Sequence, residues 1–222
     1  MNTEVLVKGT ALGHTFRQGG VDIPALQSAS FEIRERDRIA IVGPSGSGKS
    51  SLMHLIAGLD SPTSGTIAWP GLGATRSLLP ADIGFIAQAQ SLVTSLDVRE
   101  NIELPLLFLG RPKGEARDAA MEILISFGLG EIADKLPSEL SGGQMKRAAS
   151  ARALVAKPRL VLADEPTGQL DHVTAKHFLE VLFSWIDEGD TALVMTTHDP
   201  EVARYMKTLW SMDRGVLKAV SK

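Results

Sequence analysis

The sequence from Gly43 to Ser50 is Gly-Pro-Ser-Gly-Ser-Gly-Lys-Ser, which matches the phosphate-binding pattern G-x-x-x-x-G-K-[ST]. The run before it, Arg38–Val42, is apolar and β-branched and predicts a buried strand. The run after it, Ser51–Ala57, predicts a helix that ends at Gly58. A strand, a glycine-rich loop and a helix in this order form the context that a phosphate-binding loop needs. The sequence therefore predicts an α/β fold built around this loop.

The residue types in this loop suit the phosphates of a nucleotide. Glycines allow backbone N–H groups to approach phosphate oxygens, and the N-terminus of the helix adds a partial positive charge. Lys49 is placed to neutralise the β- and γ-phosphates, and the Ser50 hydroxyl to ligate Mg²⁺. The alternative is a chance glycine-rich turn, and the strand and helix that flank the loop argue against it.

Length and composition limit the class of protein. A chain of 222 residues can build one sizeable core, and 44% hydrophobic with 22% charged residues is typical of a globular protein. The net charge of −3 gives no general attraction to nucleic acid or anionic membranes. The absence of cysteine excludes disulfides and cysteine-ligated zinc. No signal peptide or membrane-spanning run is evident, so we expect work at a membrane only through recruitment.

The N-terminal part of the chain predicts β structure. Apolar alternations between Leu6 and Ile33, broken by Gly19-Gly20 and Pro24, indicate two or three antiparallel strands with a loop between them. Phe16 lies just before that loop, where its ring could stack on an adenine. A half-buried strand aromatic is an equally good interpretation of Phe16.

Gln88 is a candidate for the ligand-binding edge of the sheet. The apolar strand Ile83–Ala87 ends at this residue. Parallel α/β sheets place ligand groups at strand ends, so Gln88 could contact Mg²⁺ or the attacking water. Taken alone, Gln88 would be an ordinary amide at a strand end.

The chain changes character between Ser91 and Ser138. Leu92, Leu96, Val98, Ile102, Leu106 and Leu107 recur at helical spacing, and a second periodic run, Glu115–Phe127, ends at Gly128. Helices without an intervening strand indicate a helical subdomain at 91–140, inserted between core segments 1–90 and 141–222. The apolar run Pro105–Gly110 is either internal packing or a patch that faces a partner.

Leu140–Gln144, with the sequence Leu-Ser-Gly-Gly-Gln, predicts a second anion-binding helix N-terminus. A helix over Met145–Lys157 follows it and stops before Pro158. The alternative is a glycine N-cap that binds no ligand.

Two carboxylates end the apolar strand Arg159–Glu165. Asp164 at the strand tip can hold Mg²⁺, and Glu165 can polarise the attacking water as a general base. The alternative is an acidic pair at a helix entry before Pro166.

His198 follows the next buried strand, Thr191–Thr197. A lone histidine is more often structural than catalytic. At the same sheet edge as Gln88 and Glu165, however, it is a candidate contact for the γ-phosphate.

Together these motifs resemble, in order and over nearly the whole chain, the ATP-binding subunits of ABC transporters. The resemblance rests on the P-loop at 43–50, the Q-loop Gln88, the signature at 140–144, the Walker B strand with Glu165, the D-loop Asp171 and the switch His198. It implies the P-loop NTPase fold of ABC ATPases in one domain, 1–222. That α/β fold has a mixed sheet core, an N-terminal antiparallel β subdomain and an inserted α-helical subdomain.

The resemblance also implies a role for each matching residue, with ATP and Mg²⁺ as ligands. Glu165, His198 and Gln88 are expected to be catalytic, and Ser50, Gln88 and Asp164 to bind the metal. Expected contacts to ATP are Phe16, Gly43, Ser45, Gly46, Gly48, Lys49, Ser50, Ser51, Ser141, Gly142, Gly143, Gln144 and Asp171.

The implied partners are a second copy of the chain and an integral membrane permease, itself a dimer of subunits with few helices. Ser141, Gly142 and Gly143 would meet the γ-phosphate held by the second copy, and no nucleic acid is expected. The ATPase would lie peripherally on the cytoplasmic face of the cell membrane. A short permease helix would dock beside Ser91, Leu92 and Leu96, although these leucines could instead fill the subdomain core.

A narrower resemblance is to the lipoprotein-releasing and macrolide-exporter group. It rests on Gly58–Gly65, Arg99–Leu107 and Leu162–Gly168. The chain departs from the group by a phenylalanine in place of the commoner tyrosine, by Met-Lys-Arg after Gln144, and by a short segment between Trp69 and Ile83.

Two rival functions follow from the same ATPase motifs. DNA-repair ATPases need long inserts and translation factors need two ATPase units, and neither is present. ATP-driven signalling to cell-envelope enzymes through a membrane partner remains an alternative to transport.

Overall fold

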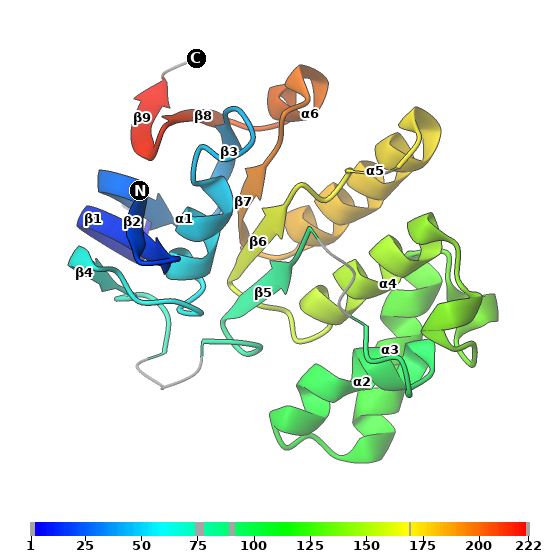
Figure 1. The fold of residues 1–222 in the computed structure, drawn as a ribbon. Coiled ribbons are helices and arrows are strands. Elements are labelled where there is room, and N and C mark those ends of the chain that lie inside the picture. The colour runs from blue at the N-terminus through cyan, green and yellow to red at the C-terminus, as the bar shows by residue number, and fades with distance from the viewer. Residues whose placement is uncertain (1–2, 74–77, 89–91, 169, 221–222) are drawn as a thin grey trace.

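The computed structural model describes residues 3–73, 78–88, 92–168 and 170–220. Its centre is a six-stranded sheet in which five strands are parallel and β9 alone is antiparallel (Figure 1). In spatial order the strands are β5 (Ile83–Ile86), β6 (Leu160–Asp164), β7 (Ala192–Thr196), β3 (Arg38–Val42), β8 (Thr208–Asp213) and β9 (Val216–Val220). The predicted mixed sheet is confirmed.

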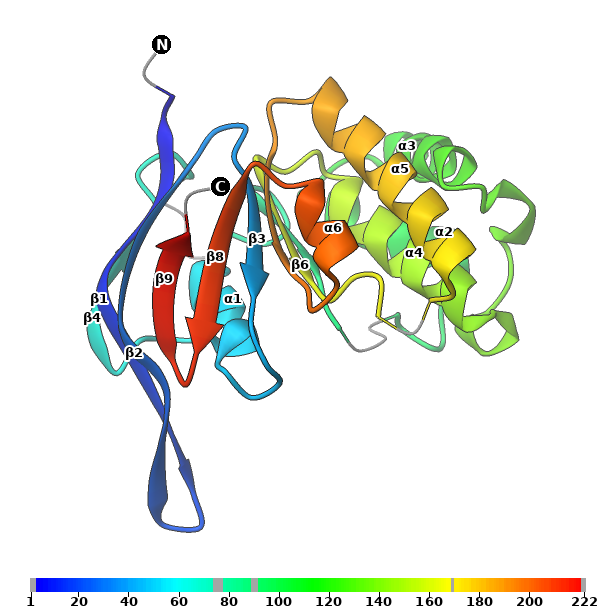
Figure 2. The same ribbon diagram turned by 90° about the horizontal axis from the view of Figure 1, so that it is seen from above.

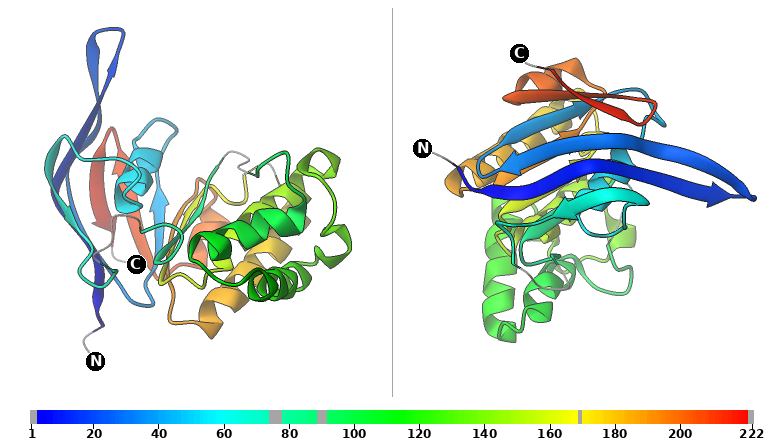
Figure 3. Two further views of the ribbon diagram at one scale, coloured as in Figure 1. Left: turned by 90° about the horizontal axis from the view of Figure 1, so that it is seen from below. Right: turned by 90° about the vertical axis from the view of Figure 1, so that its left-hand side faces the viewer.

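A second, antiparallel sheet covers one side of the molecule (Figure 3). Its order is β2 (Val21–Arg34), β1 (Val5–Gln18) and β4 (Ser64–Ala68). The predicted antiparallel strands are confirmed as two strands of 14 residues each, which turn at Gly19-Gly20 with φ of 59° and 83°. Pro24 does not interrupt β2, since β2 is an edge strand and an edge tolerates a missing N–H. The hairpin projects past the rest of the molecule (Figure 2).

Helix α1 (Lys49–Ile56) lies between the two sheets (Figure 1). Its apolar side chains join one buried cluster with residues of both sheets, among them Leu6, Ile33, Ile41, Leu52, Ile56 and Trp210. The predicted strand–loop–helix unit is therefore confirmed, and burial on two sides fixes it in place.

The other face of the large sheet carries the remaining long helices (Figure 2). They are α2 (Val98–Phe108), α3 (Lys113–Ser126), α4 (Gly142–Leu154) and α5 (His172–Glu188), with 3₁₀ turns at Gly130–Ile132 and Pro137–Glu139 and a short α6 (Pro200–Arg204). A second core joins them to the sheet and includes Leu106, Phe127, Leu154, Phe178 and Leu193.

The segment before α2 differs from the sequence expectation. Leu92 and Leu96 were expected within a helix, but α2 begins only at Val98, because Asp97 and Glu100 form a capping box. Leu92 packs partly buried against the helical core, and Ser91 lies outside the described residues. The division into core segments 1–90 and 141–222 and a helical subdomain 91–140 remains a proposal.

Asn101 ties that segment to α2. Its side chain is fully buried and accepts a hydrogen bond from Val93 N at 2.7 Å. Its amide donates to the carbonyls of Val93, Leu96 and Asp97 at 2.9–3.0 Å. The Asn101 side chain thus supplies hydrogen-bond partners to backbone groups of Val93, Leu96 and Asp97 that a helix would have paired with other backbone groups.

We expect Asn101→Ala to lower the free energy of unfolding by about 1–3 kcal/mol, because it leaves buried polar groups unpaired. Urea denaturation of the isolated chain measures this change. Phe108→Ala, on the same helix but 77% exposed, is the control and should change stability little. An unchanged midpoint for Asn101→Ala would show that the segment is held by other contacts.

Candidate nucleotide site

The phosphate-binding loop is shaped by close backbone packing. A Cβ atom at Gly43 would lie 2.1 Å from the Met212 carbonyl oxygen, and one at Gly48 would lie 2.1 Å from the Ala25 carbonyl oxygen. Gly48 also has φ of 102°, a left-handed conformation that side chains disfavour. Both positions therefore require glycine, and the loop passes directly into the N-terminus of α1, where an anion is favoured.

Lys49 is held above this loop. It is 6% exposed, and its ammonium donates to the carbonyls of Gly43 and Pro44 at 2.9 and 3.0 Å. The lysine is thus fixed where a phosphate bound by the loop N–H groups would meet it.

A cavity of about 550 Å³ opens over the loop. Its volume lies in the range of ligand pockets. Most of the residues expected to bind ATP or to be catalytic line it, namely Phe16, Gly43, Ser45, Gly46, Gly48, Lys49, Ser50, Ser51, Gln88, Glu165 and His198. The sequence analysis missed Ile23, Pro24 and Ala25 of β2, which line the cavity near the aromatic residue.

Two side chains converge on the carboxylate of Glu165, as the strand-end positions of all three residues predicted. Gln88 Nε2 lies 3.4 Å from Glu165 Oε2, and His198 Nδ1 lies 3.6 Å from the same oxygen. An amide, an imidazole and a carboxylate at this spacing can orient a water molecule and take up its proton.

Thr196 positions the two acidic residues, and the sequence analysis did not single it out. Its fully buried hydroxyl donates to Asp164 Oδ1 and accepts from Glu165 N, the latter at 2.9 Å. Glu165 has φ of 44°, so the chain turns sharply after the strand and separates the two carboxylates. A threonine at the last position of β7, beside His198, was the available sequence signal.

Phe16 lines the same cavity from β1. The ring is 44% exposed and packs edge-on against His14, with centroids 4.5 Å apart. The contact with His14 therefore orients the ring, while 44% of the residue stays exposed for a ligand.

The signature residues Ser141–Gln144 do not line this cavity. Ser141 caps α4, because its hydroxyl accepts a hydrogen bond from Gln144 N at 3.2 Å. In return, Ser141 N donates to the Gln144 side-chain oxygen at 2.9 Å. The helix therefore begins at Gly142, earlier than the predicted Met145. A Cβ at Gly142 would meet nothing within 4 Å, so this helix end is open.

Asp171 likewise lies outside the cavity lining and caps α5. Its carboxylate accepts from the N–H groups of Val173 and Thr174 at 3.1 and 3.0 Å. Hydrogen bonding, chiefly from the Thr174 hydroxyl, lowers the pKa of this carboxyl group.

The oxygen donors at the loop suit Mg²⁺. Ser50 and Gln88 line the cavity. Asp164 is buried at the end of β6, the strand beside β5, and Thr196 donates a hydrogen bond to one of its oxygens. Hydroxyl, amide and carboxylate oxygens are ligands that Mg²⁺ prefers. A magnesium ion held there would neutralise charge on the β- and γ-phosphates.

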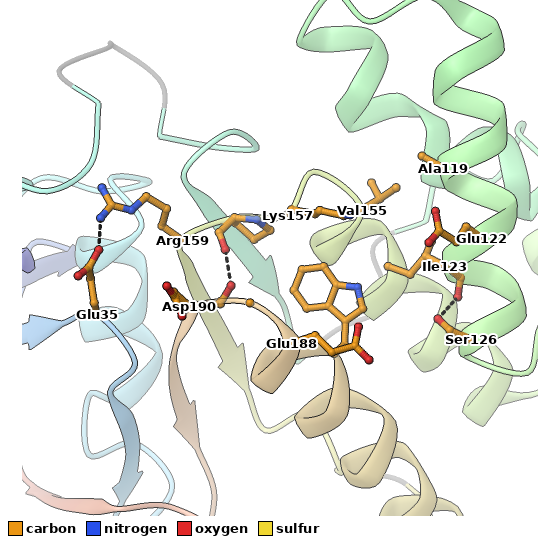
Figure 4. A pocket seen from close by; sticks show the side chains of 14 residues that line it. Glu35, Ala119, Glu122, Ile123, Ser126, Val155, Lys157, Arg159, Glu188 and Asp190 are labelled. Carbon is orange, nitrogen blue, oxygen red and sulfur yellow. Dashed lines mark hydrogen bonds and ion pairs between the residues drawn. The ribbon is translucent and has the colours of Figure 1, made fainter. Parts of the chain in front are cut away.

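A second cavity, of about 410 Å³, lies between α3, α5 and the end of α4 (Figure 4). Three of its charged side chains are already paired. Arg159 bonds Glu35 and Glu4, and Asp190 lies 2.6 Å from Arg36. None of the expected site residues lines it. Its own residues therefore give no reason to place the nucleotide there.

The comparisons with known proteins agree with a phosphate-binding loop at Gly43–Ser50. Residues 26–168 match the family model described as ABC transporter. The chain belongs to this family. It is the ATP-binding and ATP-hydrolysing subunit of an ABC transporter, as the motifs implied.

Two relatives are named lipoprotein-releasing system ATP-binding protein LolD. The one from Chromohalobacter salexigens is 38% identical over 97% of this chain and 94% of its own length. The one from Hydrogenovibrio crunogenus is 39% identical over 96% of both chains. The narrower resemblance to the lipoprotein-releasing group is thereby confirmed.

A solved structure of the ATP-binding cassette MJ0796, a dimer in a post-hydrolysis state bound to ADP and Pi, has the same fold. It superposes with a TM-score of 0.88 at 33% identity and covers 98% of this chain and 100% of its own. The predicted ABC ATPase fold is confirmed.

We expect Glu165→Gln to slow ATP hydrolysis by about 10²–10⁴-fold while ATP binding persists, because the amide cannot take a proton from water. Lys49→Ala should instead weaken nucleotide binding, since it removes the buried ammonium. Phosphate release and equilibrium binding of a fluorescent ATP analogue separate the two effects. Glu180→Gln, an exposed change on α5, is the matched control. Near-normal hydrolysis by Glu165→Gln would remove Glu165 from the role of base.

Proposed function

We propose that this ABC ATPase powers a permease that releases lipoproteins from the membrane. The observation that carries the proposal is identity of 36–39% over nearly the whole chain to proteins named lipoprotein-releasing system ATP-binding protein. Within the described ranges, none of the helices has the length and hydropathy of a membrane crossing. Energy from ATP therefore has to reach the bilayer through a partner, and we place the ATPase peripherally on its cytoplasmic face.

Within this proposal each side chain of the cavity acts at a definite place. Phe16 stacks on the adenine, and the loop from Gly43 to Ser51 holds the phosphates. Ser50, Gln88 and Asp164 would hold Mg²⁺, which would neutralise phosphate charge there. Glu165 draws a proton from the attacking water, while Gln88 and His198 orient it and contact the γ-phosphate. Hydrolysis then depends on positioning and charge neutralisation, with no covalent intermediate.

We also propose that the active unit is a homodimer with two ATP molecules between its subunits. One support is that Ser141–Gln144 do not line the cavity of their own chain. A second is that the helix end at Gly142 is open, as a surface awaiting a partner's phosphate would be. Two-fold symmetry would then bring each signature helix to the other subunit's nucleotide, near Asp171.

We expect Glu165→Gln to form dimers when MgATP is added, and the added change Gly142→Asp to prevent them. The aspartate fits the free subunit but would oppose the γ-phosphate across the interface. Gly114→Asp, at an equally open helix start in α3, is the matched control and should leave dimerisation intact. Light scattering at saturating MgATP measures the result. Dimers that persist with Gly142→Asp would show that the signature helix lies outside the interface.

For the permease contact we propose the segment at 92–96. Val93 is 41% exposed on it, whereas Leu92 packs against the helical core, so Val93 is the better anchor for a docking helix. The segment follows Gln88 closely and is tied to α2 by Asn101. A change at Gln88 could therefore reach the permease by shifting the relative stability of two states.

We expect Val93→Asp to leave the isolated ATPase stable but to abolish ATP-dependent release of a lipoprotein from vesicles containing a permease of the lipoprotein-releasing type. Leu92→Asp should instead lower thermal stability, and Val173→Asp, at a 77% exposed site on α5, should change neither property. Release by the Val93→Asp variant at the normal rate would move the docking site elsewhere. Stimulation of a cell-envelope enzyme without any release would favour the signalling alternative.

A further inference from the structure

Lys146 joins the signature helix to the Q-loop. It lies on α4, just after the Ser141 cap, in the segment Met145-Lys146-Arg147. Its ammonium donates to the carbonyl of Ala87 at 2.9 Å and to that of Gln88 at 3.2 Å. Only 8% of Lys146 is exposed, so these bonds are shielded from water.

Lys146 lies near the carboxylates of Asp164 and Glu165. Burial lowers the pKa of the ammonium, and the nearby carboxylates of Asp164 and Glu165 act in the opposite direction. The Lys146 carbonyl in turn accepts from the buried Ser150 hydroxyl at 2.9 Å. A single charged side chain therefore bonds the backbone at Gln88 from the helix that Ser141 caps.

We propose that Lys146 is a positioning residue that couples Gln88 at the nucleotide of its own subunit to Ser141 at the nucleotide of the partner. Because its ammonium bonds the main chain of Gln88, a displacement of that residue acts directly on α4 and on its signature end. This inference rests on the proposed roles of Gln88 and Ser141. The hydrogen bonds of a buried cation to two carbonyls are stronger than those of a neutral donor, so Lys146 resists leaving them.

The test compares Lys146→Met, Lys146→Gln and Lys146→Arg with the unchanged chain. Methionine fills the buried space without hydrogen bonds or charge, glutamine keeps one donor group, and arginine keeps the charge. Lys157→Gln, an exposed lysine just past the end of α4, is the control that removes one charge elsewhere. We expect Lys146→Met to lower kcat by about 2- to 30-fold with KM for ATP changed less than about twofold. Lys146→Arg should recover most of the rate.

A second measurement follows ATP-driven dimerisation with Glu165→Gln present in every variant. Lys146→Met should raise the ATP concentration needed for half-maximal dimer by the same factor as it lowers kcat. ATP binding at protein concentrations too low for dimers should be unchanged. Failure of the Glu165→Gln parent to dimerise would count against the proposed homodimer, and the kcat comparison would then decide on Lys146 alone. An unchanged kcat in Lys146→Met would overturn the coupling role. So would equal losses of ATP binding, stability and rate in Lys146→Met that Lys146→Arg does not rescue.

Discussion

The site depends on the close approach of two loop glycines to backbone carbonyls. Gly43 meets the end of β8 at Met212, and Gly48 meets β2 at Ala25. The turn after β8 reinforces this packing, since Gly215 N donates to Ser47 O at 2.9 Å and Gly215 O accepts from Gln27 N at 2.7 Å. The loop is therefore clamped between both sheets, and its N–H groups are oriented before any phosphate arrives.

The order of the parallel strands places the expected catalytic residues at one edge of the large sheet. Gln88, Glu165, His198 and the loop follow β5, β6, β7 and β3, which are neighbours in that order in the sheet. Since parallel strands end on the same side, residues far apart in sequence meet within 3.6 Å around one carboxylate oxygen. The antiparallel sheet contributes Phe16 from β1 and Ile23–Ala25 from β2, so both sheets supply residues to the cavity.

The predictable parts of this structure are those with a local signal. Apolar strands that end in polar residues were sufficient to place Gln88, Glu165 and His198 together, and the glycine pattern placed Lys49. Helix starts were less certain, because Ser141 with Gln144 and Asp97 with Glu100 form capping boxes that override the leucine periodicity. The contacts of Lys146 span 59 and 58 residues of sequence, so no local pattern reveals them. The contact of Thr196 with Asp164 spans 32 residues, and its only sequence signal is its place at the end of β7.

The place of the helical insertion gives it access to the nucleotide. It leaves β5 at the catalytic edge, beside Gln88, and returns through α4 to the start of β6, the next strand in the sheet. The two ends of this crossover are unequal. The return is the helix α4, which packs on the core, whereas residues 92–97 of the exit are held by the side chain of Asn101, and Lys146 bonds the backbone at Gln88. We propose that a change at the γ-phosphate is absorbed at this exit while α1 and the clamped phosphate loop stay fixed. In that proposal, one rigid site would drive movement in the neighbouring helices.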